Sequence, residues 1–126
     1  MAWPDAGSVS VHPLRGGLRI VWRADSSGIA SRGDILVAGS IQAWSVAPTG
    51  SGTVELRLYD RWDCDMLAGL LTAVACGSPS SGAIHWDLGA DRRRPVLTGG
   101  PHTFRAVHSA GASAAGVLDL ILGPEV

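Results

Sequence analysis

The side chains that could do chemistry in this sequence are four histidines, two cysteines and a short run of aspartates. The histidines, at positions 12, 85, 102 and 108, have no spacing typical of a zinc ligand set or a catalytic triad. The chain also lacks a nucleophile elbow, a phosphate-binding loop and an H-E-x-x-H pattern. We therefore expect a protein that is not an enzyme and uses no cofactor.

One histidine has a carboxylate close by in the sequence. His85 and Asp87 lie two residues apart on an expected strand, so their side chains share a face. Such a pair can orient an imidazole or bind a metal. The same pattern is typical of a polar outer face opposite a buried residue such as Trp86, and we favour that interpretation.

Three aspartates follow an expected strand. Asp60, Asp63 and Asp65 place carboxylates on one turn, which is a way to hold a hard cation such as calcium. The EF-hand pattern is missing, because there is no glycine at its sixth position and no glutamate at its twelfth. Aspartate also favours turns through local hydrogen bonds. We favour turn chemistry, and a cation site stays open as the alternative.

Tryptophans and arginines are the candidate residues for contact with a partner. Tryptophans outside a core can anchor a protein interface. The basic run beside Asp91 could contact phosphates or an acidic patch on a partner, or simply form a solvated loop tip. Ten basic and eleven acidic residues give a net charge of −1, which argues against a nucleic-acid partner. The candidate contact residues are Trp3, Trp62, Arg92, Arg93 and Arg94.

The elements that must position these residues are predicted to be strands. The chain has 126 residues, which suits one domain, and 46% of them are hydrophobic, which excludes disorder. Glycine or proline interrupts it about every ten residues, as in β proteins. We predict an all-β sandwich or small barrel of about eight mostly antiparallel strands. The expected strands are 8–12, 17–23, 34–47, 53–60, 83–88, 95–98, 102–109 and 117–122.

Apolar residues alternate most clearly in 17–23, 53–60 and 117–122, with Leu18, Ile20 and Trp22 inward in the first. Further expectations concern the connections. Polar turns are expected at 25–33 and 78–82, and a break at 99–101. The stretch 48–52 should close a hairpin between its flanking strands. Gly39 should mark a bulge or a bend, and 66–76 should form at most one helical turn or an irregular strand. We divide the chain into an N-terminal arm or edge strand, 1–16, and a single β domain, 17–126.

Two features of the sequence indicate the cellular compartment in which the protein works. Cys64 and Cys76 suit a reducing environment, and nothing in the sequence requires them to pair. The start of the chain lacks the basic and apolar regions of a secretory leader, and no apolar stretch is long enough to span a bilayer. We expect a soluble protein that is not secreted by the usual route.

The run from Val54 to Gly69 resembles small structural proteins encoded among the head and tail genes of tailed bacteriophages. Those carry apolar alternation, then roughly Asp-x-x-Gly-x-Asp-x-Leu, then small residues; here Asp63 stands where the family's turn usually has glycine. An opening strand like 18–22 and an end like 101–122 complete the pattern. The resemblance implies an all-β virion protein without catalytic activity.

By its size and β content the chain is similar, within that family, to capsid decoration or cement proteins, which clamp neighbouring capsid subunits from outside, often as trimers. The resemblance implies the major capsid protein and copies of this chain as partners, a place on the capsid surface, and synthesis in the host cytoplasm. Two alternatives stay open. One is a head–tail connector or tail component, and the other is a carbohydrate-binding β-sandwich module that uses Trp3, Trp44 or Trp62.

Overall fold

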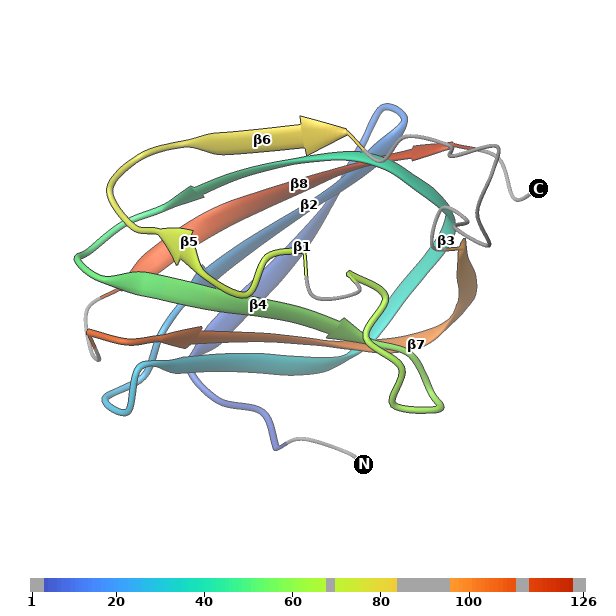
Figure 1. Ribbon diagram of the computed structural model, residues 1–126. Helices are drawn as coiled ribbons and strands as arrows, with labels where there is room; N and C mark the ends of the chain where they lie inside the picture. The colour runs from blue at the N-terminus through green and yellow to red at the C-terminus, as the bar shows by residue number, and fades with distance from the viewer. Residues whose placement is uncertain (1–3, 68–69, 84–95, 111–113, 124–126) are drawn as a thin grey trace.

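The computed structural model describes residues 4–67, 70–83, 96–110 and 114–123, and these residues form an all-β fold (Figure 1). The all-β prediction is therefore confirmed. All of its strand pairings are antiparallel. None of the described residues belongs to a helix long and apolar enough to cross a bilayer. The strands are β1 (Ser8–Leu14), β2 (Gly17–Arg23), β3 (Ile29–Pro48), β4 (Thr53–Tyr59), β5 (Val74–Ala75), β6 (Ser80–Ala83), β7 (Val96–His108) and β8 (Ala115–Gly123).

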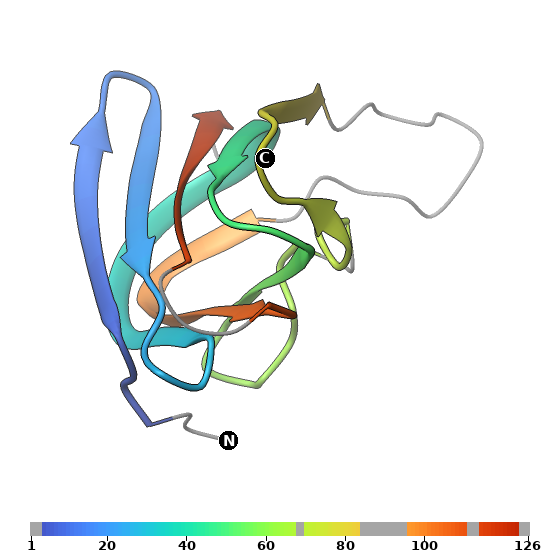
Figure 2. The same cartoon turned by 90° about the vertical axis from the view of Figure 1, so that its left-hand side faces the viewer.

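One strongly curved sheet contains all eight strands. Its order is β1-β2-β8-β3-β7-β4-β5, and β6 pairs with β3 off this path. The sheet folds over its own core, so that β4 and β7 face β2 and β8 across the interior (Figures 1 and 2). The result is a barrel-like sandwich, as the spacing of glycine and proline predicted.

Strand β3 makes this curvature possible, because it belongs to both sides of the fold. Its residues 29–40 pair with β7, and its residues 40–48 pair with β8. The register shifts three times along the strand, and Gly39 lies in the left-handed region with φ of 123°. Such bulges bend a strand and increase its twist. Gly39 itself pairs in register with Leu97, so it lies between two of these register shifts and not at a bulge, which corrects the predicted position of the bulge.

The core lies between the two sides of the sheet and consists of the inward faces predicted from alternation. Leu18, Ile20 and Trp22 of β2 are buried. Three residues of β4 and two of β8 meet them and are also buried. Each of these strands has one face against the core, which is why its sequence alternates. The buried hydrophobic side chains of β4 and β8 are Val54, Leu56, Leu58, Leu118 and Leu120.

The predicted hairpin around 48–52 is wrong. Strand β4 exists with the expected faces, but it does not pair with β3 in the described structure; β7 lies between the two. By residue 48 the bulged β3 has already crossed to the other side of the core, where it pairs with β8. The segment 49–52 therefore connects the two sides of the fold rather than two neighbouring strands.

Three further boundaries differ from prediction. The turn expected at 25–33 is shorter, because the carboxylate of Asp25 accepts bonds from the backbone of Ser27 and Ile29 and β3 starts there. The break expected at 99–101 is a bulge inside the continuous β7, where Gly99 adopts φ of 83°. The loop expected at 78–82 contains most of β6, which forms by pairing with β3.

The stretch 66–76 is irregular, as predicted: its described residues form turns followed by the two-residue strand β5. Most of the strand expected at 83–88 lies outside the described residues. At the other end of the chain, β1 pairs along its whole length with β2 and ends the sheet order. Just before β1, Ala6 forms an isolated bridge with Ser31, and the guanidinium of Arg32 donates to the carbonyl oxygen of Val9 in β1.

Candidate functional site

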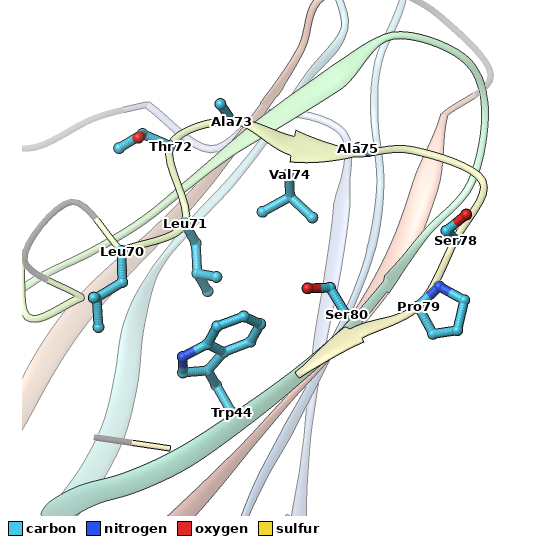
Figure 3. A pocket seen from close by; sticks show the side chains of 10 residues that line it. All are labelled: Trp44, Leu70, Leu71, Thr72, Ala73, Val74, Ala75, Ser78, Pro79 and Ser80. Atoms are coloured by element: carbon cyan, nitrogen blue, oxygen red, sulfur yellow. The ribbon is translucent and has the colours of Figure 1, made fainter. Parts of the chain in front are cut away.

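A concavity lies between two consecutive strands that do not pair with each other. β5 pairs with β4, and β6 pairs with β3, although only residues 76–79 separate β5 from β6. Consecutive strands with so short a connection ordinarily form a hairpin. Here they are held apart, and a cleft of about 470 Å³ lies between them (Figure 3).

The floor of this cleft is apolar and its rim carries hydroxyl groups. Leu71 and Val74 are buried and point towards the ring of Trp44 (Figure 3). Leu70 lies at the mouth with 51% of its surface exposed. Every described lining residue is uncharged, so the site favours a neutral occupant with an apolar group. The lining consists of Trp44, Leu70, Leu71, Thr72, Ala73, Val74, Ala75, Ser78, Pro79 and Ser80.

Trp44 reaches the cleft because of a bulge and a glycine. Sequence alternation places it opposite Ile41, but the register shift between Ile41 and Ala43 puts Ile41 and Trp44 on the same, inward side. Unbroken alternation would have placed Trp44 on the outer face, and the bulge places it inward instead. Its ring lies against Gly82 of β6, where an added Cβ would come within 2.8 Å of the ring. Only glycine permits this close contact between β3 and β6.

A second cluster joins Trp22, His108 and Cys76, which lie far apart in the sequence. The indole Nε1–H of Trp22 donates to Nε2 of His108 over 2.8 Å, and Nδ1 of His108 lies 3.7 Å from Sγ of Cys76. Because an indole nitrogen can only donate, the neutral imidazole carries its proton on Nδ1 and directs it at the sulfur.

The ionisation of this cluster is opposite to that of a catalytic cysteine–histidine pair. Burial lowers the pKa of His108 and raises the pKa of Cys76, so both groups are held neutral. A reactive cysteine needs a depressed pKa and a nearby cation. In this geometry the cluster acts as a buried hydrogen-bonded tie between β2, β7 and the segment after β5.

The three aspartates that follow β4, which we call the acidic turn, support the backbone. Oδ1 of Asp60 accepts from the amides of Trp62 and Cys64 at 2.8 and 2.9 Å. Asp65 accepts from the amide of Leu67, and Asp63 occupies the left-handed region with φ of 61°. No group of His, Cys, Asp or Glu side chains suited to a metal ion occurs among the described residues. Turn chemistry accounts for the acidic turn.

The predicted partner-contact residues are only partly placed. Trp62 projects from the acidic turn with 62% of its surface exposed, and the guanidinium of Arg61 lies 4.1 Å from the centre of its ring. A cation over one face leaves the other face for contact. The remaining candidates, Trp3, Arg92, Arg93 and Arg94, lie outside the described residues, as do His85 and Asp87.

An apolar row that sequence reasoning missed crosses the outer face of the sheet. The strand registers place Leu14 of β1 opposite Gly17 of β2, Gly17 opposite Ile121 of β8, and Ile121 opposite Ala43 of β3. Leu14 and Ile121 are 38% and 55% exposed. We call these four residues the outer row. Alternation shows that Ile121 points outward, but only the register shows which residues flank it.

Polar side chains border the outer row. Two residues further along β2 and β8, Arg19 and Asp119 form a double hydrogen bond of 2.8 and 3.0 Å. The donation from Arg19 lowers the pKa of Asp119. An apolar strip beside a fixed ion pair has the composition of a protein contact surface, with an apolar centre and a polar rim.

Cys64 and Cys76 are both free thiols.

Comparison of this chain with protein-family models, curated proteins and solved structures finds no match.

Proposed function

We propose that this chain is a non-enzymatic virion structural protein and, specifically, a capsid decoration protein that stabilises contacts between major capsid subunits. The proposal starts from the resemblance carried by residues 54–69 and by the final two strands. In this function the chain sits on the capsid surface as a small homo-oligomer. It acts by covering the junction between neighbouring subunits.

The observation that carries the proposal is the outer row. Ile121 and Leu14 are held at fixed positions by paired strands, and the glycine between them leaves their side chains accessible from outside. A rigid apolar strip costs little ordering when it meets a partner surface. On a capsid the same contact repeats many times, so each contact can be small.

The use of the polar groups supports the same conclusion. His108, the acidic turn and the ion pair of Arg19 with Asp119 each form bonds that hold strands or turns in place. These side chains stabilise a scaffold, and a protein that resists pressure from inside a capsid needs a rigid scaffold.

The direct test uses empty heads assembled from the major capsid protein encoded in the same genome. Recombinant protein is mixed with the heads, and the heads are sedimented. We expect the wild-type chain to sediment with them. Ile121→Asp should abolish binding, because it places a charge in the outer row. Leu36→Asp is the matched control, since Leu36 is 70% exposed on β3 and does not belong to the row. Failure of the wild-type chain to bind would overturn the proposal.

The native mass of the protein separates decoration from the other structural functions. Light scattering should give a trimer of the 13.0 kDa chain if the protein covers a threefold junction. A larger ring would indicate a head–tail connector or tail component instead. A monomer is compatible with decoration only if the sedimentation test shows binding to heads.

One observation favours a carbohydrate-binding module as the second candidate. Trp44 lies in a cleft with the hydroxyl groups of Thr72, Ser78 and Ser80, and aromatic rings with neighbouring hydroxyls are typical of sugar sites. A glycan array tests it. Binding of a defined sugar that disappears in Trp44→Ala, without a change in native mass, would support the module.

A further inference from the structure

The strand pairings almost close a circuit around the structure. From β6 they lead through β3, β7 and β4 to β5, and every neighbouring pair in this series is hydrogen-bonded. Among the described pairings, the one missing link is between β5 and β6. The cleft lined by Trp44 lies at this gap, with residues of both strands on its sides (Figure 3).

Within the part of the chain that the structure describes, each strand at the gap therefore has one edge without a strand partner. In the described structure β6 pairs only with β3, over the four positions from Ser80 to Ala83, and β5 pairs only with β4. An edge strand presents unpaired N–H and C=O groups, which readily pair with another extended chain. The described lining residues at the gap carry no charge, and neither strand has a bulge in its pairing; Pro79 and the short length of β5 and β6 are the features that limit pairing at these edges.

We infer that this cleft binds an extended segment of a partner protein, which adds as a strand to the edge of β6. The inference rests on the proposed function, because the partner that it identifies is the protein on which the chain assembles. Main-chain hydrogen bonds to β6 supply affinity, and one side chain of the segment enters the floor formed by Trp44, Leu71 and Val74.

The composition of the cleft limits the chemistry of that segment. An ionised side chain would lose its water without gaining an opposite charge, because the described lining residues are uncharged. The segment must therefore be neutral where it enters and must carry one large aliphatic or aromatic residue. Since side chains alternate along a strand, its neighbours at that point face the rim and can be small and polar.

Sugar binding fits the same cleft less well. A sugar stacks on an open ring face, whereas the ring of Trp44 lies close to Gly82 and packs against the core cluster. A sugar also makes no use of the free edge of β6. An extended peptide uses both the apolar floor and the edge.

The test uses nuclear magnetic resonance of the full chain with a neutral peptide, acetyl-Thr-Val-Thr-Leu-Thr-Val-Thr-amide. Its counterpart with every backbone amide N-methylated keeps the side chains but cannot donate main-chain N–H hydrogen bonds. We expect the first peptide to shift resonances of β5 and β6. At ten times its Kd it should slow hydrogen exchange of the Ser80–Ala83 amides by about tenfold. The methylated peptide should do neither.

Two variants locate the site. Leu70→Asp puts a charge at the mouth of the cleft and should weaken peptide binding by about tenfold or more. Leu36→Asp introduces the same charge at an exposed leucine that does not line the cleft, and should bind as the wild type does.

The outcomes separate this inference from the proposed function. If the peptide does not bind, or if its binding leaves the β6 amides unprotected, strand addition is overturned even where the protein sediments with heads. Binding of a maltose or cellulose oligosaccharide in place of the peptide would also overturn it. If the peptide binds as expected but the protein does not sediment with heads, strand addition at the cleft is supported and the decoration function is overturned.

Discussion

Gly116 of β8 is the position where a single substitution best tests the packing of β8 against Trp22. A Cβ at this position would lie 2.3 Å from Cζ2 and 2.5 Å from Cη2 of Trp22. Trp22 cannot easily move away, because it is 1% exposed and its indole donates a 2.8 Å hydrogen bond to His108. The backbone of Gly116 does not have a positive φ, so Gly116→Ala introduces no left-handed backbone strain.

The expected cost of Gly116→Ala has three components. Overpacking a core costs about 1–3 kcal/mol. Displacing the indole from His108 forfeits about 1 kcal/mol. Alanine offsets about 0.4–1 kcal/mol of this cost, because it lowers the conformational entropy of the unfolded chain. The free energy of unfolding should therefore fall by about 2–3 kcal/mol, which for a chain of this size lowers the Tm by roughly 10 °C.

Urea denaturation followed by tryptophan fluorescence measures this cost. Gly100→Ala is the matched control, because a Cβ there meets nothing within 4 Å and its φ is also not positive. It should leave stability unchanged or raise it slightly. In a Trp22→Phe background the benzo ring is gone, so Gly116→Ala should cost about 1–2 kcal/mol less. The packing of β8 on Trp22 would be refuted if Gly116→Ala left the free energy of unfolding unchanged. It would also be refuted if the effects of Gly116→Ala and Trp22→Phe on that free energy simply added.

Three other predictions concern ionisation and the turns. Because burial lowers the pKa of His108, the free energy of unfolding should be greatest above pH of about 6.5 and should fall as the pH drops below that value. Urea titrations of His108→Gln should show a smaller fall over the same pH range. The lowered pKa of Asp119 adds a second loss that begins only below pH of about 4. The exposed Cys64 should react with Ellman's reagent well before Cys76, whose thiol pKa is raised by burial; equal rates would contradict the placement of Cys76. Millimolar calcium should leave the Tm unchanged, because carboxylates of the acidic turn accept backbone hydrogen bonds, and a calcium-dependent rise would reopen the cation site.

The parts of the fold that could be predicted are those determined by local alternation. β2, β4 and β8 each present one face to the core, so their apolar residues alternate and their inward faces follow from the sequence. β6 has no such signal, since Ser80, Ser81 and Gly82 carry no apolar pattern. It is a strand because β3 supplies its hydrogen bonds.

Pairing was harder to predict than strand position. The turn-forming residues at 48–52 indicate that the chain reverses, but not which strand lies beside β4. That choice depends on the bulges of β3, which carry its second half to the far side of the core before the turn begins. The same bulges reverse the expected side of Trp44. A shift of one residue reverses every following side chain, so alternation fails beyond a bulge.

In the candidate site, too, local features could be predicted from the sequence, whereas contacts between strands could not. The exposure of Trp62 agrees with its position in an acidic turn. The outer row and the cleft are made by residues from three or more strands, and the sequence separates them by up to about a hundred positions. The bond between Trp22 and His108 spans 86 positions. No spacing rule connects such residues, because only the sheet register brings them together.

The number of chains that a head binds at saturation decides whether this protein decorates the capsid. Empty heads are titrated with the protein, sedimented, and analysed for the ratio of this chain to the major capsid protein. Decoration predicts a fixed ratio comparable to the number of capsid subunits, reached by Leu36→Asp but not by Ile121→Asp. A few copies per head, as for a ring at a single vertex, or binding that never saturates, would contradict the claim.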